Sequence, residues 1–158
     1  MAVDSATAHR PQVLKPPPTR LMSPIHHLAL STLVVRDYDD AIRFFVDQLG
    51  FHLVADRPLE TGKRWVVVAP DQTGTGGLLL ARAVNASQLN AVGQQTGGRV
   101  SFFLTTTNFE TSYRLFCERG VQFFESPRHE LYGTVAVFLD LYGNRWDLIQ
   151  PRDCSSLK

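Results

Sequence analysis

The sequence predicts an α+β fold that contains two tandem modules with the same element order, strand, helix, strand, strand, strand. That order is found over residues 25–82 and again over 99–151. The two predicted helices begin 71 positions apart, after Asp37 and Asn108, and their aromatic and arginine positions match in order. A repeat of this length that preserves both element order and side-chain type indicates a duplicated module.

In the first module, residues 26–35 have a strand-like pattern that ends near Asp37, a preferred helix N-cap. Apolar side chains then recur at helical spacing as far as Leu49, and Gly50 occupies the position of a left-handed C-terminal cap. We predict further strands over 51–55, 64–69 and 77–82, the last two joined by a turn rich in Gly and Thr.

Residues 83–98 carry no charge and are rich in Asn, Gln, Gly and Ala, so we interpret them as a polar linker. A strand over 99–106 opens the second module, Asn108 is predicted to cap its helix, and Gly120 is predicted to end it. Three more strands are predicted over 121–124, 134–140 and 145–150.

The first 24 residues hold five of the nine prolines and show no apolar periodicity, so a disordered tail is predicted there. An arm that clasps a partner subunit is the alternative. The same segment has no apolar stretch of the kind that a secretory signal contains.

The composition narrows the class of protein. The chain has 158 residues, of which 44% are hydrophobic and 20% charged, enough for one domain with its own core. The formal charge of +1 argues against nucleic acid as a partner. No apolar run approaches the length of about 20 residues that a membrane span needs. The two cysteines show no paired spacing, so we expect a reducing, cytoplasmic location.

The helix motif Val35-Arg-Asp-Tyr-Asp-Asp-Ala-Ile-Arg-Phe-Phe45, the following Leu49-Gly50-Phe51 and the late Gly143-Asn144-Arg-Trp-Asp147 carry a family resemblance. The layout resembles the vicinal oxygen chelate superfamily, which includes glyoxalase I, bleomycin-resistance proteins and extradiol dioxygenases. The resemblance covers about residues 26–150. It implies that the two βαβββ modules form one cup-shaped or barrel-like curved sheet.

The resemblance further implies four positions on the concave face of the cup, which hold a divalent metal in many members. They correspond here to Leu30, Leu79, Ser101 and Asp147. Leucine has no donor atom, and one carboxylate with one hydroxyl does not supply the donors of a tight site. The histidines form no pair at a ligand spacing. We therefore predict no metal and no cofactor, with a divalent metal as the alternative.

Side chains two residues apart share one face of a strand, which extends the predicted site from these four positions along each strand. Trp65 and Tyr132 are added as aromatic candidates for stacking, although the pattern leaves open which face each occupies. The predicted ligand-binding residues are Leu30, Thr32, Trp65, Leu79, Arg99, Ser101, Phe103, Tyr132, Arg145 and Asp147.

Asp147 is the predicted catalytic residue, a general base whose pKa rises if the cup is apolar. Between this role and an ion pair with Arg145 that closes the cup, we favour the ion pair, because a carboxylate beside an arginine is more often structural than catalytic. Arg99 and Arg145 are candidates for holding a carboxylate or phosphate, unless both extend into solvent. Trp146 is expected to face the core, and Tyr142 to be an exposed turn residue.

We expect a glyoxalase- or bleomycin-resistance-like protein that binds a small organic molecule in the cup between its modules without metal. The alternative is a metal-dependent enzyme, such as a glyoxalase-like lyase, an isomerase or a dioxygenase. A bleomycin binder is disfavoured because bleomycin is cationic and two arginines are expected near the cup. A scaffold with a plugged cup is a further possibility. Because each small sheet has open edges, we also predict a homodimer.

Overall fold

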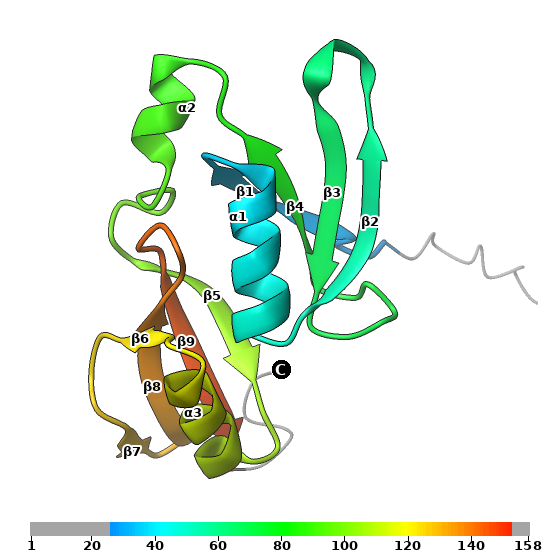
Figure 1. The fold of residues 1–158 in the computed structure, drawn as a ribbon. Helices are drawn as coiled ribbons and strands as arrows, with labels where there is room; N and C mark the ends of the chain where they lie inside the picture. Colours follow the sequence, from blue (N-terminus) through cyan, green and yellow to red (C-terminus); the bar gives the residue numbers. More distant parts are fainter. Residues whose placement is uncertain (1–25, 153–158) are drawn as a thin grey trace, which may run out of the picture.

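Two separate β-sheets, each backed by one helix, make up the fold (Figure 1). The computed structural model describes residues 26–152, so the predicted tail at 1–24 and Cys154 lie outside the described residues. The chain is α+β, and the repeated order of strand, helix and three strands is confirmed. Within 26–152 no strand pairing joins the two sheets, and no closed barrel forms.

The first sheet has four strands in the order β1-β4-β3-β2, of which β1 and β4 run parallel. The strands are β1 (Leu30–Val35), β2 (His52–Pro58), β3 (Arg64–Ala69) and β4 (Gly77–Arg82), with a short 3-10 turn, η2 (Glu60–Gly62), between β2 and β3. Helix α1 (Tyr38–Arg43) continues as a π-helical turn, η1 (Phe44–Gln48), and Gly50 follows at a φ of 74°. This positive φ is the left-handed cap that the sequence predicts.

The second sheet repeats this topology in the order β5-β9-β8-β6. Its strands are β5 (Val100–Thr105), β6 (Gln122–Phe123), β8 (Gly133–Leu139) and β9 (Arg145–Pro151), and its helix is α3 (Phe109–Glu118). A further strand, β7 (Arg128–Glu130), pairs with β8 and was not predicted. Strand β7 belongs to the loop that connects β6 to β8.

The linker contains a short helix that the sequence analysis did not anticipate, α2 (Ala86–Ala91). Asn85 caps it, because its side chain accepts a hydrogen bond from the backbone nitrogen of Gln88 at 2.9 Å. The helix has no charged residue, and Leu89 is its single large apolar residue, so no helical period is recognisable there. The first strand also begins at Leu30 rather than at residue 26.

The two predicted N-caps are confirmed. Asp37 Oδ1 accepts hydrogen bonds from the backbone nitrogens of Asp39 and Asp40, at 2.9 and 3.0 Å. Asn108 Oδ1 accepts one from the backbone nitrogen of Thr111 at 3.0 Å. Both side chains thereby satisfy backbone donors that a helix leaves without partners in its first turn.

Both modules share one hydrophobic core, which lies on the helix-covered faces of the two sheets. Trp146 of β9 is buried there, as predicted, with its ring centroid 4.4 Å from that of Phe102 and 5.8 Å from that of Phe45 in η1. Because side chains alternate along a strand, the neighbours of these residues point away from the helices. We call that side of each sheet its open face.

Tyr142 corrects one prediction, since it is partly buried rather than an exposed turn residue. Its hydroxyl contacts the backbone of Asp37 at the start of α1. The turn between β8 and β9 therefore joins the second module to the first. The turn pattern predicted the chain reversal and contained no information on this contact between modules.

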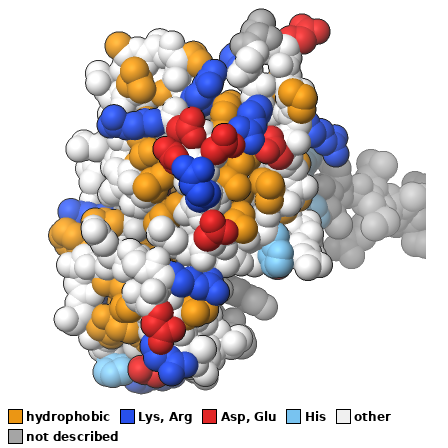
Figure 2. Space-filling view, viewed as in Figure 1, with side chains coloured by type: hydrophobic (Ala, Val, Ile, Leu, Met, Phe, Trp, Pro, Cys, Tyr) orange, Lys and Arg blue, Asp and Glu red, His pale blue; other side chains and the backbone are white. Residues whose placement is uncertain are grey.

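The helix side of the molecule carries intermingled charges of both signs (Figure 2). Over the first module, Arg43 pairs with Asp40, and Arg64 pairs with both Asp39 and Asp56. Such mixed ion pairs do not form a surface of one sign that would attract a polyanion. Among the described residues, no helix is long and apolar enough to cross a membrane.

Candidate functional site

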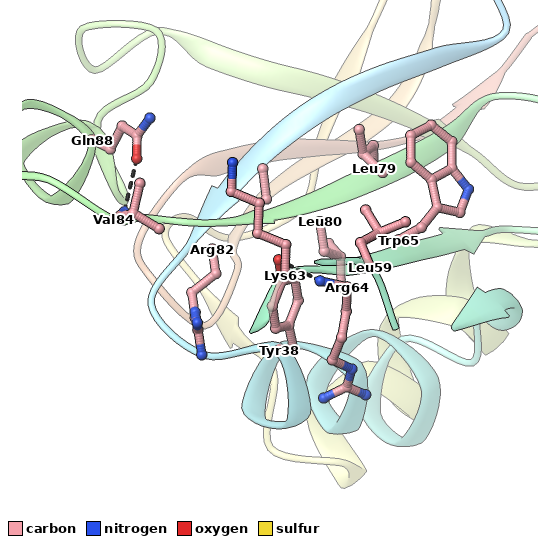
Figure 3. A pocket seen from close by; sticks show the side chains of 11 residues that line it. Tyr38, Leu59, Lys63, Arg64, Trp65, Leu79, Leu80, Arg82, Val84 and Gln88 are labelled. Atoms are coloured by element: carbon pink, nitrogen blue, oxygen red, sulfur yellow. Dashed lines mark hydrogen bonds between the residues drawn. The ribbon is translucent and has the colours of Figure 1, made fainter. Parts of the chain in front are cut away.

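The predicted site residues do not meet in a single cavity within one chain. Trp65 and Leu79 line a cavity of about 290 Å³ in the first module (Figure 3). Arg99, Phe103, Arg145 and Asp147 line one of about 450 Å³ in the second. We call these the first-module cavity and the second-module cavity. The two halves of the expected cup are therefore separate surfaces of the chain.

The cations of the first-module cavity are largely engaged by the protein itself. The Arg64 guanidinium donates hydrogen bonds to Asp56 at 2.9 and 2.5 Å and to Asp39 at 2.6 Å, and these carboxylates raise its pKa. Arg82 lies over the Tyr38 ring at 5.6 Å and donates to the Gly62 carbonyl at 3.2 Å. Both arginines thus stabilise the β2–β3 hairpin against α1.

Strand register defines which residues face each other on the open faces. In the second sheet, Phe103 of β5 lies directly across from Asp147 of β9. In the first sheet, Thr32 of β1 lies across from Leu79 of β4. Neighbouring strands are about 4.8 Å apart, so each pair shares one local environment.

The register also describes the surroundings of Leu30 and Ser101, two of the four positions taken from the family resemblance. Leu30 of β1 lies across from Gly77 of β4, and Thr32, two residues later on the same strand, lies across from Leu79. Ser101 lies at a register shift between Val100 and Phe102, and its hydroxyl is hydrogen-bonded to Thr96 at 2.9 Å. A β-bulge inserts one extra residue and thereby changes the face that follows, which counting back from the helix cap cannot detect.

Asp147 is the chemically distinctive group of the second-module cavity. Its side chain lines the cavity although the residue is only 7% exposed. Its Oδ1 atom is shielded from solvent and accepts no hydrogen bond from any residue in 26–152. Burial raises the pKa of this carboxyl group, and the charge of Arg128 partly opposes the rise. A buried carboxyl group without a donor is costly unless a ligand or a proton satisfies it.

The favoured prediction, an ion pair between Arg145 and Asp147, is wrong, since the two side chains form no salt bridge. Instead, the Arg145 guanidinium stacks on the ring of Phe124, with its carbon 4.4 Å from the ring centroid. Arg128 makes its ion pairs with Glu125 and Glu130 in the β6–β8 connection. Asp147 therefore has no ion-pair partner among the described residues.

One aromatic side chain, that of Phe103, lines this cavity. Phe103 is 65% exposed, an unusual state for a phenylalanine in a strand. Phe124 and Tyr132, at the two ends of the β6–β8 connection, are exposed as well. Tyr132 does not line the second-module cavity, and sequence reasoning missed Phe124, Val100 and Arg128. The adjacent Phe123 and Phe124 offered one signal, because alternation places one of two neighbouring rings outside the core.

The residues present do not fit a metal site of the kind found in the family. The four register-matched positions provide one carboxylate, one hydroxyl and two hydrocarbon side chains, those of Asp147, Thr32, Leu79 and Phe103. Within residues 26–152, no three His, Cys, Asp or Glu side chains gather closely enough to hold an ion. Catalytic zinc sites use three protein ligands, so this donor set is too small.

Comparisons with known proteins agree with this fold. The model of the Glyoxalase/Bleomycin resistance protein/Dioxygenase superfamily matches residues 24–148. An uncharacterized protein of Shewanella frigidimarina (strain NCIMB 400) is 48% identical over 130 residues, which cover 82% of this chain and 94% of that protein.

Two solved structures extend the comparison. UcmS2 has a TM-score of 0.70 and 25% sequence identity, over 80% of this chain and 98% of that one. TnmS3, described as an antibiotic binding protein from Streptomyces sp. CB03234, has a TM-score of 0.66 and 30% identity, over 82% of this chain and 99% of that one.

Proposed function

Because this chain belongs to the Glyoxalase/Bleomycin resistance protein/Dioxygenase superfamily, we propose that it binds a small organic molecule at the second-module cavity without a metal ion. The observation that carries the proposal is the buried, unpartnered carboxyl group of Asp147 in a cavity of about 450 Å³. Ligand pockets commonly have volumes of about 300–1,000 Å³ and a few convergent polar groups. The similarity to an antibiotic binding protein supports a binding role.

We further propose that a second copy of the chain completes the site. Phe103 and Trp65, the latter 40% exposed, lie on open faces that one chain leaves uncovered. Strands β1 and β5 are edges of their sheets, which commonly need cover. Apposition of the first module of one copy with the second module of another would close the expected cup. Sedimentation at twice the chain mass of 17.7 kDa supports this homodimer, and a monomer at micromolar concentration contradicts it.

The second candidate function is a metal-independent enzyme, favoured by the raised pKa of Asp147. A carboxyl group whose pKa lies nearer to neutrality is suited to proton transfer next to a substrate carbonyl. In that case Asp147→Asn abolishes turnover while ligand binding persists. A binding protein shows no turnover in either form.

Native mass spectrometry of the freshly purified protein tests the proposed function. We expect an organic adduct and no stoichiometric metal mass, with the adduct lost from Asp147→Ala. Asp47→Ala is the matched control, because Asp47 is an exposed aspartate in η1 that does not line the second-module cavity. One divalent ion per chain that is lost from Asp147→Ala would instead support the metal-dependent enzyme.

A further inference from the structure

We propose that the ligand of the second-module cavity is a flat aromatic molecule that carries a hydrogen-bond donor at one end and an anionic group at the other. The inference rests on the proposed function and names the class of molecule that the cavity selects. It follows from the positions of Phe103, Asp147 and Arg145 on one open face.

The aromatic requirement comes from Phe103. Its ring is 65% exposed on the wall of the cavity, and no ring of another described residue stacks on it. Every other described phenylalanine except Phe124 is buried or partly buried. A flat ligand ring placed against Phe103 would remove apolar surface from water and add a favourable ring–ring contact.

The donor requirement comes from Asp147, which lies across from Phe103 in the strand register. Its carboxyl group can only accept hydrogen bonds when ionised, and no described residue donates one. A ligand that lies on Phe103 therefore presents its edge to this carboxyl group. A hydroxyl or N–H on that edge would satisfy it, whereas an edge without a donor would bury it unsatisfied.

The anionic requirement comes from the arginines. Arg145 precedes Asp147 by two residues, so their α-carbons are about 6.6 Å apart on the same face. Stacking on Phe124 orients the guanidinium plane of Arg145, and it forms no ion pair with a described carboxylate. Arg99 lines the same cavity. A carboxylate on the ligand suits the guanidinium geometry, and a body of one or two rings spans the separation from Asp147.

The test uses three related probes on the intact protein, measured by isothermal titration calorimetry. They are 6-hydroxy-2-naphthoate, 2-naphthoate, and the fully hydrogenated counterpart of the first. We expect loss of the hydroxyl to weaken binding about tenfold or more. Saturation of the rings is expected to weaken it about threefold or more. Equal affinities of the three probes for the wild-type protein would overturn the inference, whatever the variants do.

Variants assign each effect to its residue. In Asp147→Ala the difference between the two aromatic probes should disappear, and in Phe103→Leu the difference between flat and saturated probes should disappear. Leu53→Ala, which changes an exposed apolar residue of the first module, should preserve both differences. Differences that persist in Asp147→Ala and Phe103→Leu would overturn the assignment.

The outcomes separate this inference from the proposed function. An organic adduct in native mass spectra, together with no binding of 6-hydroxy-2-naphthoate, overturns the ligand class and leaves the binding function standing. Absence of any organic adduct and of any probe binding overturns both.

Discussion

The hydroxyl group of Tyr142 makes two hydrogen bonds to the backbone of Asp37, a residue 105 positions earlier in the chain. It donates to the Asp37 carbonyl oxygen at 3.2 Å and accepts from the Asp37 nitrogen at 3.3 Å. Asp37 is also the N-cap of α1. The contact therefore fixes the β8–β9 turn of the second module to the helix start of the first, and burial raises the pKa of the phenol.

Removal of this hydroxyl tests the contact. Tyr142→Phe should lower the free energy of unfolding by about 1 kcal/mol, because it removes the hydrogen-bond partner of the Asp37 nitrogen in a partly buried site, while the Asp37 carbonyl oxygen keeps its bond from the Ala41 nitrogen. Urea unfolding measures the change. Tyr132→Phe, at an exposed tyrosine, should have little effect. Equal effects of the two changes would mean that the Tyr142 contact does not stabilise the fold.

Gly93 lies close to the turn between β8 and β9 that contains Tyr142. A β-carbon added at Gly93 would lie 2.0 Å from the Tyr142 carbonyl oxygen, and the residue has a φ of 79°. Gly97 has a similar φ of 63° but open space around it. Gly97→Ala is therefore expected to lower the free energy of unfolding by about 1 kcal/mol through backbone strain, without a steric clash. We expect Gly93→Ala to be clearly more destabilising in urea unfolding, and equal losses would contradict the close approach.

The helix caps provide a third prediction. Asp37→Ala and Asn108→Ala should each lower the free energy of unfolding by about 1 kcal/mol, because each change leaves helix-start nitrogens unpaired. Thr107→Ala, at an exposed residue one position before the second cap, is a suitable control. If the cap variants unfold at the same urea concentration as the control, the capping bonds contribute nothing to stability.

The pH dependence of the free energy of unfolding should reveal the raised pKa of Asp147. Because burial raises its pKa in the folded state, the folded protein binds more protons than the unfolded chain between the ordinary value of 3.8 and the folded value. The stability contribution of this site therefore falls as pH rises through that window. Asp147→Asn should be more stable than wild type at neutral pH by about 1 kcal/mol, and the difference should vanish below pH 3.8.

Asp56 serves as the opposite case for that measurement. The hydrogen bond from Arg64 lowers the pKa of Asp56, so its contribution is present above the ordinary value and lost as pH falls through the folded value. Asp56→Asn should be less stable than wild type at neutral pH. Urea unfolding of both variants over a pH series measures the two signs, and equal signs would contradict the account.

Much of the fold could be predicted from the sequence because its signals are local. The apolar runs at 64–69 and 77–82, bounded by turn residues, predicted β3 and β4 to the residue, and the caps at Asp37 and Asn108 marked the helix starts. Strand β7 and helix α2 were missed because neither has a long apolar period. Strand β7 forms by pairing with β8, and helix α2 follows an isolated cap at Asn85.

The site was predictable only in part. Asp147 followed from the family resemblance and Phe103 from strand alternation, and both line the second-module cavity. Ser101 lies at a β-bulge, a backbone irregularity with no signature in this sequence, and it does not line this cavity. The Arg145 guanidinium stacks on Phe124 rather than pairing with Asp147, a contact between β9 and the β6–β8 connection. Contacts of this kind depend on tertiary structure.

The most direct test of metal-free binding at Asp147 is amide chemical-shift mapping on ¹⁵N-labelled protein that has been treated with a chelator. A library of small aromatic acids is titrated without added metal. The account predicts saturable shifts centred on the backbone amides of Phe103, Arg145 and Asp147. Binding that requires an added divalent ion, or shifts confined to other surfaces of the protein, would contradict it.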